Sequence, residues 1–151
     1  MRFIRNTASA NLCYLGILFN VFYFVNLYQS DVGTYYYQIF IGASIVYNLL
    51  FLLVVFLASE AVKNYVQKYS YLLLAIGAMQ VVRIFYIPMR ARAAITAVNG
   101  VDVPVMGDGQ FYLLLVYLLI SAVCLLASAA VNYKKCRELA EHMKTLEERK
   151  P

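Results

Sequence analysis

The stretch that decides the fold runs from Tyr37 to Ser59, reads YQIFIGASIVYNLLFLLVVFLAS and contains no charged residue. An apolar helix of about 20 residues can cross the hydrocarbon core of a bilayer, which is about 30 Å thick, because a helix rises about 1.5 Å per residue. In lipid, backbone N–H and C=O groups must pair within their own segment or in a closed barrel. The stretch is therefore predicted to be a membrane-spanning helix.

Three further stretches have the same apolar character, and Arg83 is the one charged residue inside them. The chain is 63% hydrophobic and 14% charged, whereas soluble domains are nearer 45–50% apolar and about 25% charged. The sequence predicts an all-α fold, an integral membrane antiparallel four-helix bundle in which each helix touches its sequence neighbours, forming a single domain over residues 1–151. The predicted spans are residues 10–28, 37–60, 71–88 and 111–133.

Positive charge is distributed unevenly among the segments that join the spans. Ten of the 13 Lys and Arg residues lie before the first span, between spans two and three, or after span four, and only Arg90 and Arg92 lie in the other connections. Excess Lys and Arg marks the cytoplasmic side, so both termini are predicted to be cytoplasmic in the cell membrane. Residues 23–29 offer no small-x-small cleavage site, so the first span is predicted to be retained rather than removed as a signal peptide. The ten residues are Arg2, Arg5, Lys63, Lys68, Lys134, Lys135, Arg137, Lys144, Arg149 and Lys150.

The connections carry turn signals. Gln29 to Tyr36 is predicted to be a short outer turn, and Glu60 to Ser70 a charged cytoplasmic turn. In the longer outer loop, 89–110, the dipeptide Asn99-Gly100 separates two β-prone runs and predicts a short hairpin with a type I′ turn. The alternative extends the third helix to Val98 and ends it at Asn99-Gly100. Asp108 is expected to cap the fourth helix.

The hydrophilic tail, 134–151, continues a helical pattern. Leu139, Met143 and Leu146 recur at helical spacing, so the fourth helix is predicted to extend into the cytoplasm. The cysteines Cys13, Cys124 and Cys136 are predicted to be free thiols, because the topology places none of them outside the cell.

Polar residues inside the spans fall at matching depths. Asn20, Asn48, Gln80 and Ser121 lie near the bilayer middle, one from each span, and an amide facing lipid lacks hydrogen-bond partners. These four are therefore predicted to turn inward and form one hydrogen-bonded cluster. One turn outward lie Tyr23, Ser44, Arg83 and Tyr117.

Arg83 is the sharpest functional signal, because an ionisable residue inside the membrane is a functional hypothesis by default. The candidate ligand-binding set is Arg83, Gln80, Asn20, Asn48, Tyr23 and Tyr117. In the preferred interpretation, however, Arg83 snorkels to outer phosphates and the amides hold the helices together.

Signatures of enzymes, metals and cofactors are absent from the sequence. The single His, His142, lies in the hydrophilic tail, and no Gly-rich phosphate loop is present. We therefore predict no catalytic residues, no metal site and no cofactor. The basic residues are interpreted as topology determinants beside anionic lipid rather than as a nucleic-acid site.

The preferred function is a non-enzymatic polytopic membrane protein, an accessory or structural subunit that acts through helix packing with itself or another membrane subunit. The first alternative is a small transporter or channel component with an outward-facing polar site around Arg83. The lower alternative is an enzyme acting on lipid headgroups through the outer arginines.

Overall fold

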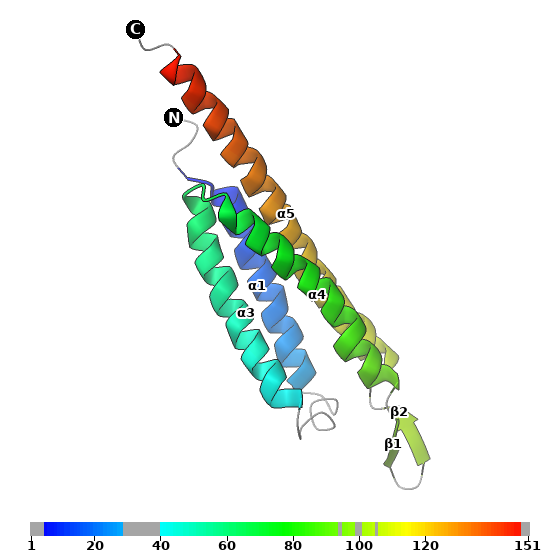
Figure 1. Cartoon of the computed structure of the whole chain (residues 1–151). Coiled ribbons are helices and arrows are strands. Elements are labelled where there is room, and N and C mark those ends of the chain that lie inside the picture. Colours follow the sequence, from blue (N-terminus) through cyan, green and yellow to red (C-terminus); the bar gives the residue numbers. More distant parts are fainter. Residues whose placement is uncertain (1–4, 29–39, 94, 99–100, 105, 149–151) are drawn as a thin grey trace.

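A computed structural model gives the structure of the chain and describes residues 5–28, 40–93, 95–98, 101–104 and 106–148. Figure 1 shows four long helices and a pair of short strands. Each of the four helices is long and apolar enough to cross a membrane. The elements are α1 (Thr7–Tyr28), α3 (Phe40–Lys63), α4 (Lys68–Ala93), β1 (Ile95–Val98), β2 (Val101–Pro104) and α5 (Asp108–Glu147).

The helices coincide with the predicted spans but not always with their ends. The third span was predicted to end at Pro88, whereas α4 continues through this residue to Ala93. An interior proline removes one backbone hydrogen bond and usually kinks or breaks a helix, but membrane helices tolerate it because neighbouring groups satisfy the freed backbone groups. The predicted outer turn at 29–36 and the first residues of the second span, 37–39, lie outside the described residues.

The helices pack in a closed ring, in which each helix contacts its sequence neighbours as predicted and α5 also contacts α1. The contacts are uneven, because α5 packs extensively against α4 and α1 whereas the contact of α3 with α4 is the weakest of the four. Two glycines, Gly77 in α4 and Gly16 in α1, permit these helices to approach α5 closely. A Cβ at Gly77 would lie 2.9 Å from Leu126 Cδ2, and a Cβ at Gly16 would lie 3.1 Å from Leu125 Cδ2. Small residues at these positions let the helix backbones come together.

The surface of the helices is unlike that of a water-soluble bundle, and the interior holds polar side chains as well as an apolar core. Large apolar side chains are exposed on all four helices, for example Leu18 on α1, Leu53 on α3, Val82 on α4 and Val123 on α5. The buried residues include many polar ones: Asn6, Ser9, Asn20, Asn48, Ser59, Ser70, Gln80, Arg83, Ser121, Ser128 and Asn132.

Strands β1 and β2 pair antiparallel, with Ile95 opposite Pro104 and Val98 opposite Val101. The alternative in which the third helix continues to Val98 is wrong, because α4 ends at Ala93. The turn residues 99–100 lie outside the described residues, so the type I′ turn stays a prediction.

The predicted cap of α5 also needs correction. Gly107 is the N-cap residue and forms no side-chain cap hydrogen bond. Asp108 is instead the first helical residue, and its Oδ1 atom lies 2.9 Å from Nη2 of Arg92. This ion pair ties the end of α4 to the start of α5.

Three parts of the chain meet at one end of the bundle. Figure 1 shows the start of α1, the α3–α4 turn and the far half of α5 at the end opposite the strands. A hydrogen bond from Asn6 N to Lys63 O, 3.0 Å long, joins the first two of these parts. Helix α5 continues to Glu147, which confirms the predicted helical extension.

Candidate functional site

A layer of buried polar side chains crosses the middle of the bundle, and every helix contributes to it. We call it the Arg83 layer. Each of its members is buried, and Arg83 is the most accessible at 7% exposed. The layer consists of Asn20 from α1, Asn48 from α3, Gln80 and Arg83 from α4, and Ser121 from α5.

The guanidinium of Arg83 points into this layer. Its Nη1 atom donates to Oε1 of Gln80 at 3.2 Å and to Oδ1 of Asn20 at 3.3 Å. Its Nη2 atom donates to Oδ1 of Asn48 at 3.0 Å. Arg83 is therefore held by three carbonyl oxygens from three helices. The preferred sequence interpretation, in which it snorkels to the outer surface, is wrong for this structure.

The amides also bond to one another. Gln80 Nε2 donates to Asn20 Oδ1 at 3.0 Å and to Ser121 Oγ at 3.4 Å. Asn20 Nδ2 donates to Asn48 Oδ1 at 3.4 Å. Ser121 Oγ donates to the backbone carbonyl of Gly16 at 2.8 Å. The predicted inward-facing cluster is confirmed, because each of these groups finds a partner inside the bundle.

Two tyrosine rings lie against the guanidinium. The Cζ atom of Arg83 is 4.9 Å from the ring centroid of Tyr23 and 4.5 Å from that of Tyr47, within the range of cation–π attraction. Tyr47 is not among the site residues predicted from the sequence, although it adjoins Asn48 at the same depth. Tyr117 packs instead against the rings of Phe19 and Phe22, and no described contact joins it to Arg83.

The positive charge of Arg83 has no described counter-charge. The ion pairs among the described residues join Lys63 to Glu60, Arg92 to Asp108 and Arg137 to Glu141. Amide oxygens carry only partial negative charge, so they solvate the guanidinium without neutralising it. A buried charge without a partner is costly in a medium of low dielectric constant.

A second buried cluster, the Asn132 cluster, lies at the end of the bundle opposite the strands. Asn132 Oδ1 accepts from Asn6 Nδ2 at 3.0 Å, and Asn132 Nδ2 donates to Ser70 Oγ at 2.8 Å and to Val66 O at 3.3 Å. Cys136 Sγ donates to the carbonyl of Tyr65 at 3.2 Å. Helix α5 thus holds both the start of α1 and the α3–α4 turn.

Between the two clusters, serines join α1 to α5. Ser9 Oγ donates to the carbonyl of Ser128 at 2.9 Å, and Ser128 Oγ donates to the carbonyl of Ser9 at 2.8 Å. The thiol of Cys13 lies 3.1 Å from Ser128 Oγ. This seam is not among the contacts predicted from the sequence. The available signal was the alternating spacing of three and four residues that begins at Asn6, just before α1, and continues along the core face of α1 at Ser9, Cys13, Gly16, Asn20 and Tyr23.

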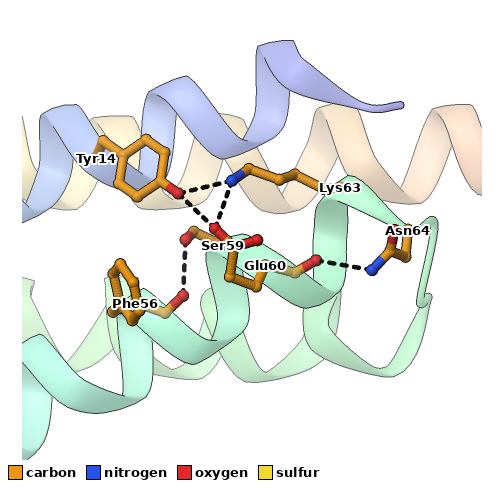
Figure 2. Close-up of polar contacts among 6 residues, drawn as sticks. All are labelled: Tyr14, Phe56, Ser59, Glu60, Lys63 and Asn64. Carbon is orange, nitrogen blue, oxygen red and sulfur yellow. Dashed lines mark hydrogen bonds and ion pairs between the residues drawn. The ribbon is translucent and has the colours of Figure 1, made fainter. Parts of the chain in front are cut away.

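At the end of the bundle opposite the strands, the exposed surface carries a small charged group on α1 and α3 (Figure 2). Tyr14 donates its hydroxyl to Glu60 Oε1 at 2.7 Å and accepts from Lys63 Nζ at 2.8 Å. Lys63 also pairs directly with Glu60. Solvent or headgroups reach these side chains, so the group fastens the α1–α3 interface without forming an enclosed site.

The described part of the chain holds no candidate metal centre. No group of three or more His, Cys, Asp or Glu residues is placed there to hold a metal ion. The thiols of Cys13, Cys124 and Cys136 are free, as predicted. The Arg83 layer is therefore the candidate site. A scan against known protein families and searches of curated proteins and of solved structures found no match to this chain.

Proposed function

We propose that the chain is a four-span integral protein of the cell membrane that acts without catalysis, as an accessory or structural subunit working through helix packing. The observation that carries this proposal is the apolar surface of the four helices, combined with polar side chains in the interior. Large apolar side chains are exposed on all four helices, while Asn, Gln, Ser and Arg side chains are buried between them. In water such a surface would associate, whereas in lipid it is the favourable one.

The orientation follows from charge and shape together. Seven described cations belong to the end of the bundle where α1 starts and the tail emerges, whereas Arg90 and Arg92 lie in the part of α4 next to the strands. The seven are Arg5, Lys63, Lys68, Lys134, Lys135, Arg137 and Lys144. Lys and Arg beside the spans favour the cytoplasmic face. The proposed topology therefore places both termini in the cytoplasm and the strands outside.

Topology is tested by cysteine labelling of the full chain in intact cells, starting from a variant without its own cysteines. Asp102→Cys places a thiol at an exposed position in β2, and His142→Cys places one at an exposed position in the α5 extension. A membrane-impermeant maleimide should modify position 102 directly and position 142 only after permeabilisation. Labelling of position 142 in intact cells would refute the topology. Cys136 itself is a poor reporter because it is buried.

The subunit role predicts an assembly larger than one chain of 17.2 kDa. Its mass is measured by light scattering on the particle extracted in mild detergent, with the detergent contribution subtracted. A particle that contains one chain at every concentration tested contradicts the subunit role and leaves the membrane topology untouched.

A second candidate is a small transporter or channel component. The observation that favours it is the buried charge of Arg83, which no described carboxylate neutralises. In this reading an anionic or polar substrate approaches the Arg83 layer from the outer side. The discriminating variant is Arg83→Lys, because a lysine keeps the charge and loses the planar fork of donors.

A further inference from the structure

We propose that Arg83 and Ser44 together bind a singly charged oxyanion, supplied by a carboxylate or by the phosphodiester of a lipid headgroup. This inference rests on the proposed membrane location, because the cost of an unneutralised guanidinium is high where water is excluded. The site would lie in the half of the bundle nearer the strands, beside the Arg83 layer.

The donors of Arg83 are only partly used. A guanidinium carries five N–H groups in one plane. The bonds to Asn20, Gln80 and Asn48 use three of them, and no described side chain accepts from the other two. Paired N–H groups of arginine are suited to the two oxygens of a carboxylate or a phosphate.

Ser44, four residues before Asn48 in α3, supplies an independent observation. Its Oγ atom is buried and has no hydrogen-bond partner among the described residues. Buried hydroxyls in folded proteins are nearly always bonded, so an unbonded one calls for a missing partner. A hydroxyl can donate to an anion while it keeps its own position on the helix.

Asn48 contacts both of the residues that carry unused donors, Arg83 and Ser44. Its Oδ1 atom accepts from Arg83 Nη2 at 3.0 Å, and its Nδ2 atom donates to the backbone carbonyl of Ser44 at 2.8 Å. Ser44 and Asn48 are four residues apart in α3 and so share one face of the helix. The side chain of Asn48 therefore contacts both the guanidinium of Arg83 and the backbone of Ser44.

The charge of the ligand follows from the charge of the site. The layer holds one guanidinium and no described carboxylate. A ligand with one negative charge brings the net charge of the site to zero, whereas a doubly charged phosphate monoester would leave an excess negative charge buried. The contact of α3 with α4 is the weakest among the packed helix pairs, so Arg83 and Ser44 come from the two helices that separate with least loss of packing.

The test measures thermal unfolding of the full chain in dodecyl maltoside, a detergent without charge. One arm adds sodium acetate against sodium chloride at equal ionic strength. The other adds phosphatidylglycerol against diacylglycerol. In at least one arm, the oxyanion should raise the melting temperature saturably by about 5 to 10 °C over its control, the rise expected from a ligand near 100 times its Kd. Acetate alone identifies a soluble carboxylate, and phosphatidylglycerol alone identifies a lipid headgroup.

Ser44→Ala is the decisive variant, because the hydroxyl that it removes has no described partner and its loss should leave folding intact. It should reduce the rise at least twofold. The matched control is Ser59→Ala. Ser59 is a buried serine of the same helix, and its hydroxyl donates to the backbone carbonyl of Phe56 in that helix at 2.7 Å. This control should keep the full rise, and a folded Arg83→Lys should lose it. No rise above either control, or an equal rise in wild type and Ser44→Ala, would overturn the proposal. Neither result bears on the topology, which the labelling experiment tests separately.

Discussion

Asn132 is the residue whose removal should destabilise the bundle most through lost hydrogen bonds alone. It is fully buried in α5 and bonds to Asn6, Ser70 and Val66. Asn132→Ala removes the side chain and leaves its partners in place. A buried donor or acceptor left without a partner costs about 1 to 3 kcal/mol.

The expected magnitude can be built up from the three partners. The amide of Asn6 is itself fully buried and would be stranded, at a cost of about 1 to 2 kcal/mol. The Ser70 hydroxyl can rotate toward a helix carbonyl, so its loss is smaller, about 1 kcal/mol. The carbonyl of Val66 lies in an exposed turn where water can replace the bond. The sum is about 2 to 3 kcal/mol, above the average of about 0.6 kcal/mol for one interhelical bond in a membrane protein.

The assay is reversible unfolding by sodium dodecyl sulfate in mixed micelles, followed by circular dichroism. The control is Asn26→Ala, since the Asn26 amide donates to Phe22 O of its own helix at 2.9 Å. Its loss should cost about 0.5 kcal/mol. In the double variant with Asn6→Ala, the two substitutions should be non-additive by at least about 1 kcal/mol. A loss at Asn132 equal to that at Asn26, with no coupling to Asn6, would refute the reasoning.

Three further outcomes are expected. Gly77→Val should lower the free energy of unfolding by about 1 to 3 kcal/mol, because the new side chain meets Leu126. Its control, Gly42→Ala, adds a Cβ with nothing within 4 Å and should be neutral or stabilise the protein by up to about 1 kcal/mol. The same mixed-micelle titration measures both variants, and equal effects would contradict the packing of α4 on α5. Ser128→Ala should cost about 1 kcal/mol and show coupling to Ser9→Ala, and simple additivity in that cycle would remove the reciprocal serine pair as a stabilising contact. Arg92→Gln should cost less than about 1 kcal/mol, because its pair with Asp108 is exposed, and a loss that does not shrink with added salt would show that contact with the Phe111 ring, 4.8 Å from Arg92 Cζ, dominates.

Much of the Arg83 layer could be predicted without coordinates. Asn20, Asn48, Gln80 and Ser121 fall at one depth once four spans are assigned, and an amide cannot face lipid without losing its hydrogen bonds. Depth along a span depends only on residue number, so it can be read from the sequence. The partners of each amide depend on how the helices rotate and which helix stands opposite, and these depend on packing.

The errors have the same origin. Tyr117 is in the candidate set because it lies at a suitable depth, but its ring contacts Phe19 and Phe22, whereas Tyr23 and Tyr47 lie beside the guanidinium. Snorkelling was preferred for Arg83 because a lone arginine near the outer end of a span can reach the headgroups. In the structure, the guanidinium instead donates to three carbonyl oxygens from three helices. These oxygens come together only when the helices pack.

The sequence by itself determined that four apolar helices form, approximately where they lie and that their polar residues turn inward, because the hydrophobicity of each segment and the need to pair its backbone are local properties. The tertiary structure decided which polar groups meet. Asn6 and Ser9 precede the first predicted span, and Asn132 lies at the end of the last, yet packing of α1 on α5 buries all three together. Contacts between residues so distant in sequence depend on helix rotation and close packing at glycines, which are properties of the assembled bundle rather than of any one segment.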